Sequence, residues 1–112
     1  MIYHIATRED WDAAQEAGEY SADSLKGEGF IHCSTAGQVQ ATANRFFRWR
    51  QDLVLLHIDE NEVQTEIKYE NLEGGTDLFP HICGTLPIKA VIRVMVLFPD
   101  QDGFFLVNLT HK

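Results

Sequence analysis

The stretch from Gly29 to Ser34 (GFIHCS) constrains the fold most, because it requires a short buried strand that ends directly before a helical pattern. Phe30 and Ile31 supply the apolar bulk of that strand. His32 and Ser34 lie two residues apart, so in an extended backbone they share one face. An imidazole and a hydroxyl that lie side by side on one strand face could line a polar binding site. The segment is equally suitable as a structural strand, so it locates a pocket without naming a reaction.

The rest of the chain places helical patterns early and strand patterns late. Helices are predicted from Thr7 to Gly18 and after Ser34, where an apolar stripe recurs at Val39, Ala43, Phe46 and Phe47. The residues between them, 19–28, are polar, and we expect an irregular loop there. Strands are predicted at 1–6, 29–34, 53–59, 62–71, 78–82, 91–98 and 104–109, with turns at 73–76 and 99–103. This order predicts an α+β domain.

Two sequence pairs have the spacing of a helix capping box. Thr7 is followed three residues later by Asp10, and Gly18 is placed to end that helix. Thr35 precedes Gln38 in the same way, although Ser34 is an alternative cap. Both helices therefore have a predicted start.

Charge and composition exclude several classes of protein. A chain of 112 residues with a net charge of -8 fits one domain spanning residues 1–112 and argues against non-specific binding to nucleic acid or anionic membranes. Arg45, Arg48 and Arg50 are the candidate basic cluster, although a solvated helix end is the simpler interpretation. The two cysteines match no zinc or redox spacing, and no apolar leader opens the chain. We therefore expect reduced thiols, no metal and a cytoplasmic protein.

Four histidines lie in or beside predicted strands, and they are the main candidates for chemistry: His4, His32, His57 and His81. Imidazole titrates near neutral pH and both donates and accepts hydrogen bonds. His57 shares its face with Leu53 and Leu55, which favours a role in the core. Glu66 and Glu70 share a strand face, so either is a candidate to orient a histidine or to act as a general base, although a solvated edge is the simpler interpretation.

Other residues have both a structural and a functional interpretation. Cys33 fits a small buried apolar residue better than a nucleophile. Ser34 fits a cap better than an acyl-transfer serine, since no Gly-x-Ser-x-Gly turn is present. Aromatic side chains are candidates for a stacking platform, and the ones nearest the histidines are Tyr3, Tyr20, Phe30 and Tyr69.

Taken together, the motifs resemble a mostly bacterial domain-of-unknown-function family. The resemblance rests on Tyr3-His4-Ile5, Trp11, the Gly29–Ser34 stretch, Glu70 and the run Leu78-Phe79-Pro80-His81-Ile82-x-Gly84-x-Leu86-Pro87. The family usually has tyrosine at the position of Cys83 and often proline at that of Thr85. Its members are similar to the ADP-ribosyltransferase fold, a curved, split, mainly antiparallel β-sheet, here with two helices in the N-terminal half.

This resemblance implies a cleft that binds NAD or a related nucleotide. His4, Tyr3, Phe30 and Ser34 would then contact the cofactor, with His4 holding the nicotinamide-side ribose. His81 would lie near the position of the catalytic glutamate and, with Glu70 and His32, would carry a ribose-directed transfer.

Three other functions stay open: a non-catalytic sensor of a small ligand or a protein-interaction module, a metal hydrolase, and a surface module without a site. Whether the chain is an enzyme is left open as well. The deciding observation is whether His4, His32 and His81 line one cavity.

Overall fold

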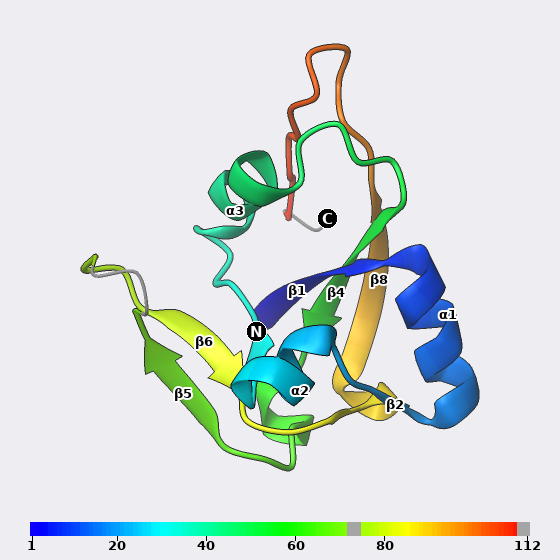
Figure 1. The fold of residues 1–112 in the computed structure, drawn as a ribbon, viewed down its shortest axis with the longest axis vertical. Coiled ribbons are helices and arrows are strands. Elements are labelled where there is room, and N and C mark those ends of the chain that lie inside the picture. Colours follow the sequence, from blue (N-terminus) through cyan, green and yellow to red (C-terminus); the bar gives the residue numbers. More distant parts are fainter. Residues whose placement is uncertain (72–74, 110–112) are drawn as a thin grey trace.

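A three-stranded antiparallel sheet forms the centre of the molecule. The structure is a computed structural model and describes residues 1–71 and 75–109. In this sheet β4 (Leu53–Ile58) lies between β1 (Ile2–Thr7) and β8 (Val91–Leu97), as Figure 1 shows. All six residues of β4 are buried, which fits its near-continuous run of Leu, Val and Ile.

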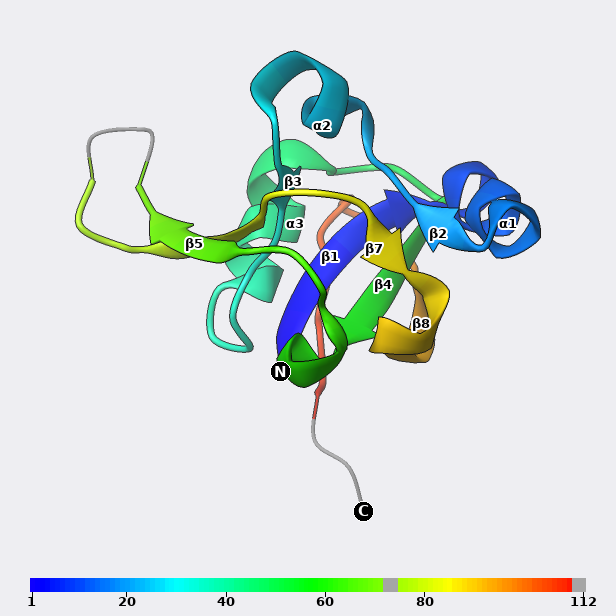
Figure 2. The ribbon, with the colours of Figure 1, turned by 90° about the horizontal axis from the view of Figure 1, so that it is seen from below.

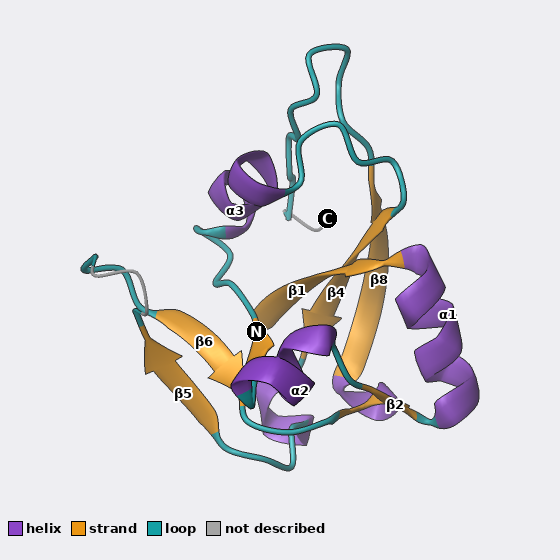
Figure 3. Cartoon of the chain, viewed as in Figure 1, coloured by secondary structure: helices purple, strands orange, loops and turns teal. Residues whose placement is uncertain are grey.

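The two faces of the central sheet carry separate apolar clusters. One face packs with α1 (Arg8–Ala17), which contributes Trp11 and Ala14. The other face packs with α3 (Val39–Phe46) and with the returning chain at Phe105. Figure 3 shows α1 and α3 on different sides of the strands. Alternation along β1 and β4 therefore divides the core into two halves.

A second antiparallel sheet lies beside the first. It consists of β3 (Ile31–His32), β6 (Phe79–Ile82) and β5 (Ile67–Glu70), with β6 in the middle. A single bridge between Tyr3 and Ser34 connects it to β1, and Figure 2 shows β5 projecting away from the central strands. The shorter elements are β2 (Glu19–Tyr20), α2 (Asp23–Glu28), β7 (Leu86–Pro87) and the 3-10 turns at Glu60–Glu62 and Ile88–Ala90.

Most of the predicted elements are confirmed, with the α+β class. Helix α1 begins after Thr7, whose hydroxyl accepts the Asp10 N–H at 3.1 Å, and it ends at Gly18 in the left-handed conformation (φ 86). The strand predicted at 62–71 is shorter: the 3-10 turn includes Glu62, and β5 begins only at Ile67. The turn predicted at 73–76 lies partly outside the described residues.

Two predicted elements are wrong, and one predicted capping pair is only partly formed. Residues 19–28 are not an irregular loop but contain β2 and α2, so the described residues hold three helices instead of two. The predicted Thr35–Gln38 pair is confirmed in part: the Gln38 side chain accepts the Thr35 N–H at 3.0 Å, but α3 begins only after Gln38, which makes no side-chain cap bond, and Ser34 is not the cap. Residues 104–109 form no strand, because side chains of α3 take their backbone bonds: Asn44 bonds both the N–H and the carbonyl of Phe105. Within the described residues, no helix has the length and apolar character to cross a membrane.

Candidate functional site

Strand register in the second sheet brings the predicted polar residues together. His32 on β3 lies directly opposite His81 on β6, so both side chains project from the same face. On β5, Lys68 lies opposite His81 and Glu70 follows two residues later, which places the Glu70 carboxylate on that face too. Residues from three separate parts of the chain therefore share one surface.

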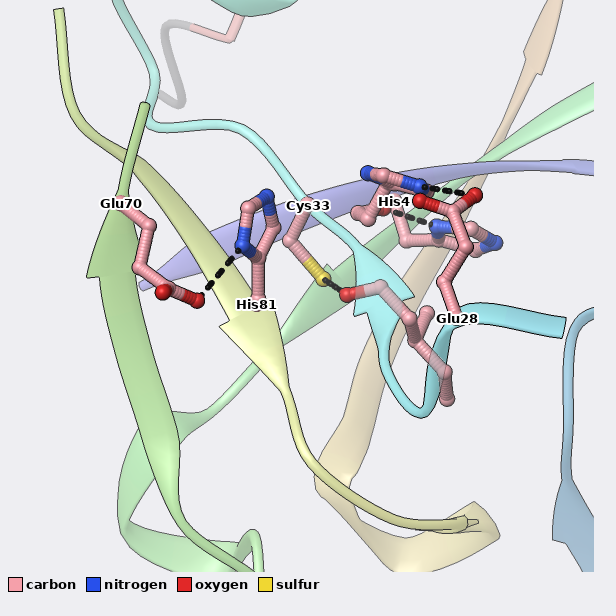
Figure 4. A network of polar contacts seen from close by, with 7 residues as sticks. His4, Glu28, Cys33, Glu70 and His81 are labelled. Atoms are coloured by element: carbon pink, nitrogen blue, oxygen red, sulfur yellow. Dashed lines mark hydrogen bonds and ion pairs between the residues drawn. The ribbon is translucent and has the colours of Figure 1, made fainter. Parts of the chain in front are cut away.

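His81 is the most enclosed member of this group. Its side chain is only 4% exposed, and its Nδ1 lies 3.4 Å from Glu70 Oε1 (Figure 4). The Phe30 ring stacks on it with a centroid distance of 4.4 Å and an interplanar angle of 19°. Because a carboxylate only accepts, Nδ1 carries the proton. This leaves Nε2 as the nitrogen with a lone pair when the ring is neutral, and no described residue bonds to it.

His32 forms a second imidazole–carboxylate pair beside the first. Its Nε2 lies 3.2 Å from Glu28 Oε1, and both side chains are about half exposed, at 48% and 53%. The His32 ring meets His81 edge-on, with centroids 5.2 Å apart. One imidazole is therefore enclosed and the other is open to solvent.

His4 is held differently, because both of its ring nitrogens are bonded inside the protein. Nδ1 donates to the His32 carbonyl at 2.5 Å, so Nε2 is the acceptor for the Tyr20 hydroxyl at 2.8 Å. Burial lowers the pKa of His4 from 6.5 to about 4, more than the hydrogen bond to His32 raises it. His4 is thus a neutral link between β1 and β3, and binding a ribose through its ring would require breaking one of these bonds.

All three imidazoles line one cleft of about 850 Å³. Of the seven predicted site residues, six contribute to its wall; the seventh, Phe30, contacts the rings of His32 and His81 instead. Ser34 lies in the wall with its hydroxyl 3.4 Å from Thr42 Oγ1. The lining consists of Tyr3, His4, Ile5, Glu28, His32, Cys33, Ser34, Gly37, Gln38, Ala41, Thr42, Arg45, Phe46, Phe47, Glu70, Asn71, Asp77, Phe79 and His81.

The opposite wall was not predicted from the sequence. It is formed by α3 and the turn before it, with Gln38, Thr42, Arg45 and Phe46. The Gln38 side chain donates to the Leu78 carbonyl at 2.9 Å and so ties this wall to the second sheet. The sequence gave Gln38 only a capping role and placed Arg45 only in an arginine cluster, so neither residue pointed to this wall.

Charge in the cleft is uneven. Carboxylates come from Glu28, Glu70 and Asp77, whereas Arg45 is the only arginine or lysine among the described lining residues. The Arg45 guanidinium lies over the Phe46 ring, 4.8 Å from its centroid. An anionic group of a ligand is therefore best placed against α3, and a neutral or cationic group near the histidines.

Several other predicted features do not form part of the site. The three arginines make no cluster, since Arg48 bonds the Asp102 carbonyl and Arg50 pairs with Asp52. The four aromatic residues form no common platform: Tyr20 bonds His4 and the Tyr69 hydroxyl donates to Glu60, so only Tyr3 and Phe30 adjoin the cleft.

No group of three or more potential metal ligands occurs in the described part of the chain. Cys33 is buried, which raises the pKa of its thiol, and it serves as a small apolar residue as predicted.

Comparison with known proteins agrees with this architecture. A family model described as "Protein of unknown function (DUF952)" matches residues 5–94, a range that includes His32, Glu70 and His81. The chain belongs to this family. It is also similar to the crystal structure of protein CC0527 from Caulobacter crescentus, with a TM-score of 0.84 and 36% identity over 94% of this chain and 92% of that chain.

Two further structures of CC0527 give the same result. The crystal structure of a double mutant has the same TM-score, identity and coverage. The solution NMR structure has a TM-score of 0.80 and 36% identity, with 92% of this chain and 89% of that chain covered. Comparison with curated proteins gives no match. The family description and these structures name no activity, so function is argued from the cleft.

Proposed function

We propose that the cleft binds NAD or a related nucleotide and that His81, held by Glu70, is an acid/base group for a transfer at the ribose. The observation that supports this most is the His81–Glu70 pair at the wall of a cleft of about 850 Å³, a size within the usual range of small-molecule sites. The carboxylate fixes the tautomer of His81 and leaves Nε2 free to take or give a proton.

The arrangement of the elements supports an ADP-ribosyltransferase-like interpretation of the fold. The two three-stranded antiparallel sheets, connected by the Tyr3–Ser34 bridge, and a helix that lines the cleft with the second sheet support the split sheet that the motifs imply. In this interpretation Phe30 and Tyr3 border the base or nicotinamide. Arg45 is then the group that meets a phosphate, because it is the cationic side chain of the cleft wall.

The chemistry assigned to His81 follows from its neighbours. Cleavage of a ribose–nitrogen bond develops positive charge on the sugar, and a carboxylate stabilises that charge better than a neutral imidazole. Glu70 supplies the carboxylate next to His81, while Nε2 of His81 accepts the proton of an attacking hydroxyl. Removing such a group commonly costs roughly a hundredfold or more in rate.

Isothermal titration with NAD, ADP-ribose and nicotinamide tests the binding. We expect heat from the nucleotides, a loss of at least about tenfold in affinity for His81→Ala and Arg45→Ala, and little change for Glu66→Gln. Glu66 is the matched control, because it is a carboxylate of the same segment that is exposed and outside the cleft wall. No heat from any of the three ligands at about millimolar concentration contradicts the proposal.

Chromatography of the same mixtures decides between the two forms of the function. Release of nicotinamide from NAD that stops in Glu70→Gln assigns a transferase or glycohydrolase. Binding without any product assigns the alternative, a non-catalytic sensor. In both cases we expect the protein to work in the cytoplasm, where nucleotides are available and its two thiols stay reduced.

A further inference from the structure

Phe30 lies against both histidines of the second sheet. Its ring is stacked on that of His81, with centroids 4.4 Å apart and an interplanar angle of 19°, and it meets the His32 ring edge-on at 4.9 Å. The Phe30 side chain is half-buried and is not part of the cleft wall, whereas both histidines are. Phe30 is therefore placed to support the imidazoles that form the wall.

The local backbone brings Phe30 to this position. Helix α2 is followed by Gly29 in the left-handed conformation (φ 87), and the Gly29 N–H donates to the Leu25 carbonyl at 3.1 Å. The chain then enters β3, so Phe30 and His32, two residues apart, share one face. Because His32 is paired with His81 in the register of β3 and β6, Phe30 is a diagonal neighbour of His81. Aromatic side chains reach each other across such a diagonal.

The orientation of the His81 ring requires more than its contact with Glu70. The torsion that turns an imidazole about its Cβ–Cγ bond is broad and has no single preferred value. The distance of 3.4 Å between Nδ1 and Oε1 exceeds the usual range for such hydrogen bonds, about 2.7–3.2 Å, so this contact alone holds the ring weakly. The stack with Phe30 restricts the ring to one plane, and Glu70 then selects the edge that carries Nδ1.

We propose that Phe30 is a positioning residue for His81, whose stacked ring holds the imidazole where Glu70 fixes the proton on Nδ1. The inference rests on the proposed function only for its effect on rate, because the ring is oriented without a ligand. An aliphatic side chain at this position fills the space but offers no flat face, so the His81 ring turns and part of the protein loses the contact with Glu70. Only the fraction with the proton on Nδ1 has a lone pair on Nε2 to accept a proton.

NMR of the imidazole nitrogens in the ligand-free protein tests this positioning. Long-range ¹H–¹⁵N correlation spectra at about pH 8, above the ordinary imidazole pKa of about 6.5, distinguish a protonated ring nitrogen from one with a lone pair. We expect one His81 species, protonated on Nδ1, in the wild type and in Phe30→Tyr, which keeps the flat ring. Phe30→Leu should give a mixture of tautomers. Phe98→Leu is the matched control, because Phe98 is exposed and outside the cleft wall, and its spectrum should match the wild type.

Kinetics connect the ring orientation to the reaction. When NAD is cleaved, kcat of Phe30→Leu should fall by the same factor as the fraction of His81 that is protonated on Nδ1, and Phe30→Tyr should restore it. A change in KM alone means that Phe30 only contacts the ligand, and this result overturns the inference. A protein without turnover contradicts the proposed function alone, and the spectra then decide the role of Phe30.

A second variant keeps the test decisive. If Phe30→Leu does not fold, Phe30→Met takes its place, because methionine is flexible, fills irregular gaps and has no flat face. A folded Phe30→Leu or Phe30→Met protein that shows only the Nδ1-protonated species of His81 overturns the inference. So does a wild type in which His81 carries its proton on Nε2.

Discussion

The neutral state of His4 makes protein stability depend on pH in a specific window. Burial lowers its pKa from 6.5 to about 4, so the folded protein resists protonation that the unfolded chain accepts. The stabilisation that depends on neutral His4 is fully present above pH 6.5. It is lost progressively as the pH falls from 6.5 through about 4, because the unfolded state binds more protons in that range.

The size of the effect follows from the two pKa values. Moving a pKa from 6.5 to about 4 corresponds to roughly 3 kcal/mol at full protonation, and most of it is lost by about pH 4.5. This conversion suits His4 because its side chain is buried with both nitrogens bonded. Since stabilities of small domains are only about 5–15 kcal/mol, the change is easily measured.

The assay is urea unfolding of the wild type and of His4→Gln at about pH 7.5 and about pH 4.5. His4→Gln lowers the stability at both pH values, because the bonds to the His32 carbonyl and to Tyr20 are weakened. The wild type should lose roughly 2–3 kcal/mol more than the variant between the two pH values, since all other groups titrate in both proteins. Equal losses in the two proteins would refute the neutral, buried state of His4.

Two further predictions concern strain and thiol reactivity. Gly103→Ala should destabilise the protein by roughly 1–3 kcal/mol in thermal unfolding, because Gly103 has φ +83 and an added Cβ would lie 2.5 Å from the Trp49 ring. Gly37→Ala, which meets nothing within 4 Å, is the control, and equal Tm values for the two variants would contradict the packing. A thiol reagent should modify Cys83, which is partly exposed, and spare Cys33, whose burial raises its thiol pKa. Rapid labelling of both cysteines in folded protein, measured by mass spectrometry, would show that Cys33 is not enclosed.

Local sequence patterns predicted the parts of the fold that depend on neighbouring residues. The cap at Thr7, the end at Gly18 and the buried run of β4 follow from spacing and residue type within a few positions. The strand predicted at 104–109 is wrong because its hydrogen-bond partners are distant in the sequence. Its pattern fits a strand, but Asn44 and Gln40 of α3 take its backbone bonds, and these residues lie more than sixty positions away.

The candidate site was predicted in its residue types but not in its geometry. The histidines of apolar strand patterns, His32 and His81, were recognisable from residue type, and the alternation of 62–71 placed Glu70 on a strand face with Glu66. Only the register of β3 against β6 and of β5 against β6 shows that they meet. The role of His4 as an internal link depends on its contact with Tyr20, a residue of the stretch that was predicted to be irregular.

The most direct test of the cleft as the ligand site is a titration followed by backbone amide NMR. ADP-ribose added to ¹⁵N-labelled protein should shift the resonances of β3, β6 and α3, including Arg45 in its last turn, since these elements line the cleft around His81. The same titration of His81→Ala should give much smaller shifts. Shifts confined to β8 or to α1, or unchanged spectra at about millimolar ligand, would contradict the assignment of the cleft.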